Sequence, residues 1–219
     1  MFKTVVKIGG SITEKCSEKH LLELGNMLSK LFKKLKNFVI VPGGAFFVEL
    51  IRETYKKYNI DEETAHWMAI HAVEQNALFL KKFIPNSDII KLKNLTSKNF
   101  KISKLPIVSV LDFTQKYSKL EHTWNSTSDA IASEIAIYLK AKKIIFVKDI
   151  EGINVNEILK EKIPINELNQ LKTSPIDRNT PKLLTGKKIK AFIVNGFYLE
   201  RLNDLLLEKE NVKAIEFLC

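Results

Sequence analysis

The 219-residue chain is poor in several features, and each shortage excludes a class of protein. It has only two cysteines, Cys16 and Cys219, so neither a cysteine-ligated metal cluster nor a disulfide framework is expected. No apolar run approaches the about 20 residues that a membrane helix needs, and the chain starts with a strand-like segment instead of a leader pattern. We therefore expect a cytoplasmic globular protein with no membrane partner.

Arginine is also scarce, with only three residues against a formal net charge of +10, so lysine supplies nearly all of the positive charge. Nucleic-acid binding is one explanation of such a charge. However, the lysines are spread along the whole chain and lack the interleaved aromatic residues of an RNA-binding surface. We therefore expect no nucleic-acid partner and interpret the charge as a solvated surface that attracts small phosphorylated substrates.

Familiar catalytic and metal motifs are missing as well. No G-x-x-x-x-G-K-[ST] or G-x-G-x-x-G run occurs, and there is no protein-kinase signature or serine nucleophile elbow. His66 and His71 are five residues apart, which places them about 140° apart around a helix and not at the spacing of a helical zinc pair. We therefore expect no metal site made of protein side chains alone.

What the chain does contain is an alternation of apolar strand-like runs and amphipathic helix-like segments. We expect strands at 2–9, 38–41, 107–111, 144–147, 191–194 and near 212–217, with a weak strand within 86–104. We expect helices at 14–35, from the second glycine turn to about 58, and at 61–83, 128–140 and 198–207, with a helix ending near 184 and surface loops and short helices at 154–172. Unbroken apolar strands are typical of a mainly parallel sheet covered on both faces. The sequence therefore predicts an α/β fold, a three-layer αβα sandwich in a single domain of residues 1–219.

Two of the expected strands run into glycine turns, Gly9-Gly10-Ser11 and Pro42-Gly43-Gly44. Glycine leaves backbone amides open to a ligand, and together with the start of a helix these amides make an anion site. A plain tight strand-to-helix turn is the alternative for each. Because ligands bind at the carboxyl ends of parallel strands, the two turns together predict a site that handles two phosphate groups.

Four segments occur in order along the chain: Lys7-Ile8-Gly9-Gly10-Ser11, Val41-Pro42-Gly43-Gly44, Ser126-Thr127-Ser128-Asp129-Ala130 and Val147-Lys148-Asp149-Ile150-Glu151-Gly152. They resemble the signatures of the amino acid kinase superfamily, and the match spans essentially the whole chain. Three further segments, Ala65-His66-Trp67-Met68-Ala69-Ile70, Trp124–Asp129 and Val194-Asn195-Gly196, resemble the archaeal branch that phosphorylates [5-(aminomethyl)furan-3-yl]methyl phosphate in methanofuran biosynthesis.

The resemblance implies direct transfer of the γ-phosphoryl group of ATP, with Mg²⁺ bridging the ATP phosphates, to a small phosphomonoester. It implies an acceptor-substrate lobe at 1–122 and a nucleotide lobe at 123–219. A uridylate kinase or an isopentenyl phosphate kinase is the alternative within the superfamily. A nucleotide-binding sensor or storage protein without catalysis is the alternative from another class. Relatives are usually dimers or larger, so a homo-oligomer is expected by resemblance only.

The resemblance also implies roles for particular residues. It implies catalytic roles for Lys7, Asp129 and Lys182, with Asp129 positioning the lysines instead of acting as a base. It implies nucleotide binding by Gly9, Gly10, Ser11, Asp149, Gly152 and Asp177, and acceptor binding by Gly43, Gly44, Ala45, Arg52, His66, Trp67, Asn125 and Thr127. Structural alternatives stay open: a dipole-favoured helix start for Asp129, core packing for Trp67 and Phe46, and a carboxylate pair for Arg52.

The chain departs from the family pattern in two places. Ala45 stands where relatives often have a third glycine, and its methyl group would tighten the acceptor pocket. Later, the segment 177–182 replaces a glycine-rich run that usually precedes a lysine. Lys182 is the positional candidate for that lysine, Arg178 and Lys187 compete with it, and a solvated surface lysine is the structural alternative.

Overall fold

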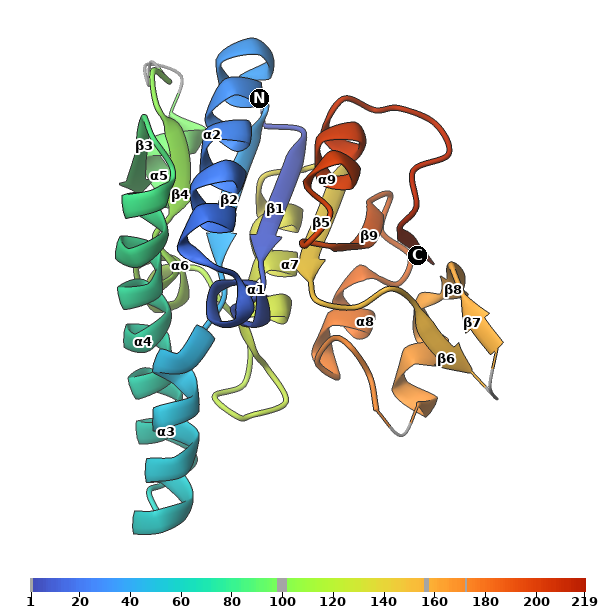
Figure 1. Ribbon diagram of the computed structural model, residues 1–219. Coiled ribbons are helices and arrows are strands. Elements are labelled where there is room, and N and C mark those ends of the chain that lie inside the picture. Colours follow the sequence, from blue (N-terminus) through green and yellow to red (C-terminus); the bar gives the residue numbers. More distant parts are fainter. Residues whose placement is uncertain (1, 98–101, 156–157, 172) are drawn as a thin grey trace.

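The computed structural model in Figure 1 describes residues 2–97, 102–155, 158–171 and 173–219. Within these residues, eight strands form one sheet in the order β3 (Ser87–Ile90), β4 (Leu105–Val108), β2 (Phe38–Pro42), β1 (Thr4–Ile8), β5 (Lys143–Lys148), β9 (Lys190–Asn195), β10 (Ile215–Leu218) and β8 (Lys162–Pro164). β10 runs antiparallel to β9, and the other neighbouring strands run parallel. The predicted mainly parallel α/β fold is confirmed.

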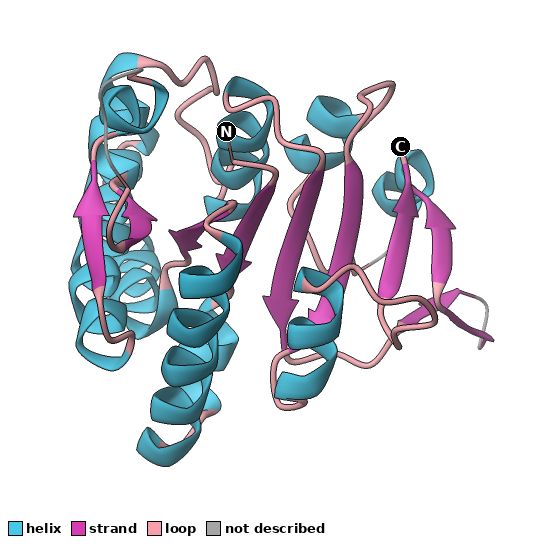
Figure 2. Cartoon of the chain, turned by 90° about the horizontal axis from the view of Figure 1, so that it is seen from above, coloured by secondary structure: helices cyan, strands magenta, loops and turns pink. Residues whose placement is uncertain are grey.

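Helices cover both faces of this sheet, as the view from above in Figure 2 shows. They are α1 (Gly10–Lys15), α2 (Glu18–Leu35), α3 (Ala45–Tyr58), α4 (Glu62–Phe83), α5 (Leu92–Thr96), α6 (Val110–Lys116), α7 (Ser128–Tyr138), the 3₁₀ helix η1 (Ile165–Gln170), α8 (Asn179–Leu184) and α9 (Leu199–Leu206). α2 and α9 pack together on one face, and α7 packs behind β1 and β5 on the other (Figure 1). None of the described helices is both long and apolar enough to cross a membrane.

The apolar runs seen in the sequence become the central strands. Every residue of β1, β2 and β4 is buried, and their side chains form one core with those of α2, α4 and α7. Covering both faces of a parallel sheet requires such continuous apolar strands. Lys7 is therefore unusual, because it is a charged residue inside a fully buried strand.

Three predicted boundaries are wrong. The expected helix at 14–35 is split into α1 and α2, because Ser17 caps a new helix by accepting a hydrogen bond from the His20 amide at 3.2 Å. The expected strand at 107–111 ends at Val108, because Ser109 caps α6 in the same way. The region 154–172 contains strand β8 and a hairpin of β6 (Ile153–Val155) and β7 (Ile158–Lys160) besides η1, and its residues 156, 157 and 172 lie outside the described part.

The carboxyl ends of β1, β2 and β5 meet at one edge of the sheet (lower edge in Figure 1). α1 begins directly after β1, and α3 begins directly after β2. The segment before α7 and the turn after β5 reach the same edge, which therefore gathers the four quoted sequence segments.

Candidate active site

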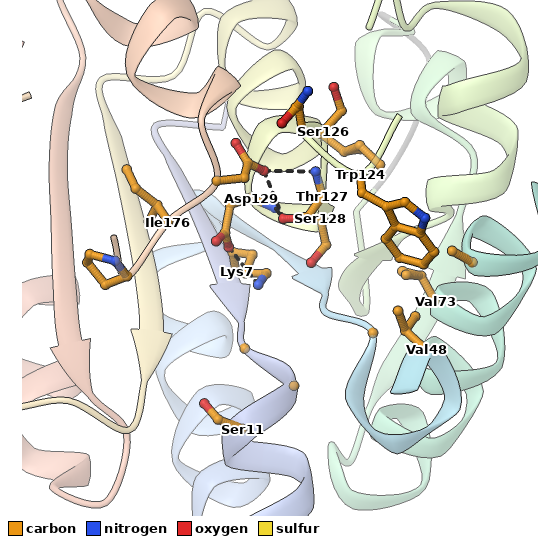
Figure 3. A pocket seen from close by; sticks show the side chains of 18 of the residues that line it. Lys7, Ser11, Val48, Val73, Trp124, Ser126, Thr127, Ser128, Asp129 and Ile176 are labelled. Atoms are coloured by element: carbon orange, nitrogen blue, oxygen red, sulfur yellow. Dashed lines mark hydrogen bonds and ion pairs between the residues drawn. The ribbon is translucent and has the colours of Figure 1, made fainter. Parts of the chain in front are cut away.

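A cavity of about 670 Å³ opens at this edge. Its walls come from both glycine turns, the facing sides of α3 and α4, and segments 123–131, 148–150, 168–171 and 174–178 (Figure 3). The cavity brings together most of the predicted site residues: Lys7, Gly9, Gly10, Ser11, Gly44, Ala45, Arg52, His66, Asn125, Thr127, Asp129, Asp149 and Asp177. It does not bring in Gly43, Trp67, Gly152 or Lys182, which are absent from its lining.

One carboxylate at the centre of the cavity holds two ammonium groups. The Nζ atom of Lys7 lies 2.6 Å from Oδ1 of Asp129 in an ion pair (Figure 3). The Nζ atom of Lys148 donates a hydrogen bond to Oδ2 of the same carboxylate at 2.7 Å. Lys7 comes from β1, Lys148 from the end of β5, and Asp129 from the first turn of α7. The sheet therefore fixes the backbone of the two lysines, and the helix behind it fixes that of the carboxylate.

Burial and charge act against each other in this cluster. Burial lowers the pKa of Lys7, and the Asp129 carboxylate offsets only part of that effect. Burial would raise the pKa of Asp129, but the nearby ammonium groups of Lys148 and Lys7 outweigh it and lower that pKa to about 2. A carboxylate with such a low pKa is a poor proton acceptor, so its chemistry suits the positioning role that the resemblance implies.

The two glycine turns touch through main-chain atoms. The Gly43 amide donates to the Ile8 carbonyl at 2.9 Å. A Cβ atom added to Gly10 would lie 2.6 Å from the Ala45 nitrogen, and one added to Gly43 would lie 2.8 Å from the Gly10 nitrogen. Neither position has room for a side chain. For Gly43, which does not line the cavity, this tight packing explains the glycine without any ligand.

The second glycine turn is held by α4 on one side and opens into the cavity on the other. Buried Asn76 on α4 donates from Nδ2 to the Gly43 carbonyl at 2.8 Å. Ala45 follows with a φ of 51°, in the left-handed region that is costly for an L-residue. Such strain persists only where the surroundings dictate it. The first-turn amides of α3 have no partner within their helix, and Gly44, Ala45 and Val48 at this end line the cavity, so the turn suits an oxyanion.

Asp177 and Thr127 join two walls of the cavity to each other. Oδ2 of Asp177 accepts from the Thr127 amide at 2.9 Å, the Thr127 hydroxyl at 2.8 Å and the Ala130 amide at 2.9 Å. Its Oδ1 accepts from the amides of Asn179 and Thr180. Both side chains thus have protein partners. These bonds account for them as a brace between α7 and α8, and the contacts with nucleotide and acceptor implied by the resemblance stay predictions.

Aromatic and basic groups line the side of the cavity next to α3 and α4. The Arg52 guanidinium lies 5.3 Å from the centre of the Trp124 ring and pairs with Glu49 at 2.6 Å. His66 stacks on His122, with ring centres 4.2 Å apart. Burial and the neighbouring His122 lower the pKa of His66 to about 4, so its imidazole is neutral at pH 7. The sequence analysis quoted Trp124 within a segment but gave it no role.

Trp67 faces an adjoining hollow between α3 and α4 instead of the cavity. Its indole nitrogen donates to Glu63 at 2.7 Å. Because the helix turns by about 100° per residue, Trp67 cannot share the direction of the neighbouring His66. Of the two residues that the sequence analysis grouped as acceptor contacts, His66 therefore lines the cavity and Trp67 does not, although their ring centres are 5.5 Å apart.

Lys182, the predicted catalytic lysine near the end of the chain, is the clearest departure from the expected site. Lys182 lies on α8 with its Nζ atom on the Asn179 amide oxygen at 3.2 Å, outside the cavity. Lys187 is also absent from the lining, whereas Arg178 is present. The second ammonium group on Asp129 belongs to Lys148, which the sequence analysis missed as a site residue. The available signal was its position at the end of an apolar strand, as for Lys7.

The remaining predicted nucleotide contacts divide in the same way. Asp149 lines the cavity and pairs with Lys15. Gly152 does not line the cavity, and neither does the preceding Glu151. The carboxylate of Glu151 instead forms an ion pair with Arg201, with an N–O distance of 3.0 Å. In the described part of the chain no group of three or more His, Cys, Asp or Glu side chains is arranged to hold a metal. Protein groups alone therefore offer no metal cage here.

Comparison with known proteins agrees with this geometry. The model of the amino acid kinase family matches residues 2–195. The chain is 30% identical over 211 residues to a [5-(aminomethyl)furan-3-yl]methyl phosphate kinase from Methanocaldococcus jannaschii, covering 95% of this chain and 94% of that protein. Its fold is similar to the crystal structure of uridylate kinase from Archaeoglobus fulgidus, with a TM-score of 0.75 and 16% identity over 99% of this chain and 98% of that chain. It is also similar to an isopentenyl phosphate kinase in complex with substrate, with a TM-score of 0.61 and 16% identity over 98% of this chain and 100% of that chain.

The family match covers both glycine turns, the Asp129 segment and the end of β5, which are the parts that build the cavity. The relative from Methanocaldococcus jannaschii aligns along nearly the full length of both proteins. The chain therefore belongs to the amino acid kinase family.

Proposed function

We propose that this protein transfers the γ-phosphoryl group of ATP to the phosphate of a small phosphomonoester, and that the acceptor is [5-(aminomethyl)furan-3-yl]methyl phosphate. The observation that carries the proposal is the central arrangement of the cavity. Two glycine turns in main-chain contact open beside a carboxylate that holds one buried lysine, Lys7, and one partly buried lysine, Lys148. Such a site suits two phosphate groups brought together and neutralised, which is the main task in phosphoryl transfer.

In this proposal, ATP phosphates lie at the first turn, against Gly9, Gly10 and Ser11. The acceptor phosphate lies at the second turn, against the α3 amides of Gly44 and Ala45. Residues 1–122 then hold most of the acceptor and residues 123–219 most of the nucleotide, with the first glycine turn and Trp124 as the exceptions on either side of that division. The ATP phosphates would hold a Mg²⁺ ion, since the described side chains form no metal cage, and the ion would neutralise part of their charge. The homo-oligomer implied by the resemblance stays a prediction.

The acceptor needs no general base, because a phosphate oxygen is already anionic at neutral pH. Asp129, with its pKa lowered to about 2, keeps its charge and orients Lys7. Lys7 then neutralises charge on the transferring group.

Two observations support the furan acceptor. The relative named for that substrate aligns over nearly the whole chain. In addition, the acceptor side of the cavity presents the Trp124 ring beside apolar Val48 and Val73 (Figure 3). A flat ring suits a furan, and the aromatic face of Trp124 attracts the aminomethyl cation.

A coupled assay of ADP release with a panel of acceptors tests the proposal. The panel contains [5-(aminomethyl)furan-3-yl]methyl phosphate, UMP, isopentenyl phosphate and, as a matched control, the furan alcohol without its phosphate. We expect the highest kcat/KM with the furan phosphate and no turnover of the alcohol. Robust turnover of UMP or isopentenyl phosphate, with none of the furan phosphate, would overturn the choice of acceptor.

A nucleotide-binding protein without catalysis is the competing function. The Lys7→Ala variant separates the two, because it removes the cation proposed to contact the transferring group while leaving the glycine turns in place. We expect it to abolish turnover. Turnover absent from both proteins, with nucleotide binding retained, would favour the sensor or storage function, whereas turnover equal to that of the wild type would overturn the role of Lys7.

A further inference from the structure

The cluster at the centre of the cavity carries more positive charge than its carboxylate can neutralise. Lys7 and Lys148 both contact Asp129, at 2.6 Å and 2.7 Å, and the three side chains are only 5%, 15% and 5% exposed. Two ammonium groups and one carboxylate leave one positive charge in a place with little access to water. Charges buried in this way are costly unless they are paired.

Within the described residues, no carboxylate of the cavity wall other than Asp129 forms an ion pair with Lys7 or Lys148. Asp177 accepts five hydrogen bonds from Thr127, Ala130, Asn179 and Thr180. Asp149 pairs with Lys15. The charge of Asp177 acts on Lys7 without contact, and each ammonium group, with Asp129 as its one carboxylate partner among the described residues, can also contact an anionic ligand.

We propose that Lys148 is a second catalytic residue, whose ammonium group binds the transferring phosphoryl group of ATP beside Lys7. This inference rests on the proposed kinase function and extends it. The path of the side chain supports it, because a Cβ atom added to Gly9 would lie 3.5 Å from the Lys148 Cγ atom. The stem of Lys148 thus runs beside Gly9 of the first glycine turn, and its ammonium group reaches Asp129.

The chemistry explains why two cations are useful here. An oxygen of the acceptor phosphate forms a bond to the γ-phosphorus, and the bond from that phosphorus to the oxygen bridging the β- and γ-phosphates breaks. The electron pair leaves with ADP, and no proton needs to move. Negative charge spreads over the oxygens of the transferring group and the bridging oxygen. Fixed ammonium groups stabilise that charge most strongly in a site that excludes water.

Two other interpretations of the second cation that acts beside Lys7 are weaker. The sequence pattern pointed to Lys182, but that side chain lies on Asn179 outside the cavity. A purely structural role for Lys148 would require that Asp129 lack another cation. Lys7 already neutralises it, so charge balance does not call for a second lysine.

The test compares Lys148→Gln with Lys143→Gln, a matched control at the opposite end of the same strand. The Lys143 ammonium donates to the Leu205 carbonyl at 2.8 Å and does not line the cavity. With the acceptor that the wild type uses best, we expect Lys148→Gln to lower kcat by about 100-fold. We expect Lys143→Gln to retain the wild-type kcat. A kcat near the wild-type value in Lys148→Gln, with a large loss in Lys182→Gln, would overturn the inference.

Calorimetric binding of AMP-PNP and ADP gives a second readout that needs no acceptor. If Lys148 contacts the transferring group, Lys148→Gln weakens AMP-PNP binding by about tenfold and leaves ADP binding unchanged. A merely structural lysine would weaken both nucleotides equally, and that outcome refutes the inference. A wild type that turns over no phosphomonoester refutes the proposed function instead, and the nucleotide comparison still decides whether Lys148 contacts the γ-phosphoryl group.

Discussion

Replacing Asp129 by asparagine tests the charge balance of the cavity through stability. The amide has nearly the shape of the carboxylate, so the variant Asp129→Asn opens no cavity and only removes the negative charge between Lys7 and Lys148. Removing one partner of a buried ion pair costs about 3–5 kcal/mol, because the other partner stays buried and uncompensated. The lowering of the Asp129 pKa from 3.8 to about 2 corresponds to about 2.5 kcal/mol in favour of the ionised side chain. We therefore expect the free energy of unfolding to fall by about 3–5 kcal/mol.

Urea unfolding at pH 7 in a buffer free of phosphate measures this change. The matched control is Asp88→Asn, which removes a carboxylate that is 37% exposed and pairs with Lys81 and Lys104 on the surface. Surface pairs of this kind contribute at most about 1 kcal/mol. A loss in Asp129→Asn no larger than the loss in Asp88→Asn would show that the cluster is not a buried charge system.

A second substitution makes the test sharper. Adding Lys148→Met to Asp129→Asn removes one of the two uncompensated ammonium groups, so we expect the double variant to be more stable than Asp129→Asn alone. In the wild-type background, the same Lys148→Met substitution should not stabilise the protein to that extent. Additive effects of the two substitutions would contradict the shared carboxylate.

The pH dependence has a defined sign. Asp129 has a lower pKa in the folded protein than in the unfolded chain, so its stabilisation is complete above pH about 4 and is lost as the pH falls toward 2. The variant Asp129→Asn should lack this component of acid unfolding. An acid limb identical to that of the wild type would contradict the assignment.

Three further predictions concern the turns and α4. Gly10→Ala should destabilise the protein by about 1–3 kcal/mol and lower kcat, because the new methyl group meets the Ala45 nitrogen. The control is Gly186→Ala, at a position where φ is 71° and the space around it is open. It should cost about 1 kcal/mol from backbone strain alone and leave kcat unchanged. Asn76→Ala should cost about 1–3 kcal/mol and raise the KM for the acceptor, because the Gly43 carbonyl loses its buried donor; an unchanged KM would argue against a link to the acceptor turn. The pKa of His66 is lowered from 6.5 to about 4 in the folded protein, so between these pH values the unfolded chain binds a proton that the folded protein does not. The free energy of unfolding therefore falls as the pH drops through this range. His66→Gln should flatten the pH dependence of the urea midpoint between pH 6.5 and 4.

The fold was accessible from the sequence because its signals are local. Apolar runs such as residues 38–41 and 144–147 become buried strands, and the glycine turns follow directly after β1 and β2. The boundaries that failed depend on single polar residues. The leucine periodicity of α2 continues toward α1 in the sequence, and only the bond from the His20 amide to Ser17 shows the break. Strands β6 and β7 are three residues long, too short for an alternating pattern to be seen.

The central site residues were less accessible because their partners are distant in the chain. Asp129 and Lys7 are 122 positions apart, and only the sheet and α7 bring their charges together. The one signal for Lys148, its position at the end of an apolar strand, is weak in a chain with so many lysines. Asp177 was predicted to contact the nucleotide, and the sequence does not show that its carboxylate has protein donors instead. Those five donors lie on α7, on α8 and just before α7, and the fold brings them together. Sequence pattern located the segments of the site, whereas contacts across the fold decide which side chains remain free for a ligand.

The main-chain contact between Gly10 and Ala45 has a consequence for how such an enzyme can change its substrate. In the proposed enzyme, this contact sets the separation between the donor and acceptor phosphates, and it uses backbone atoms. The walls that meet the rest of the acceptor are side chains of α3, α4 and the segment before α7. Mutations in those walls can therefore alter which molecule is phosphorylated while the distance that phosphorus travels stays constant. Substrate choice and reaction geometry are thus open to selection separately.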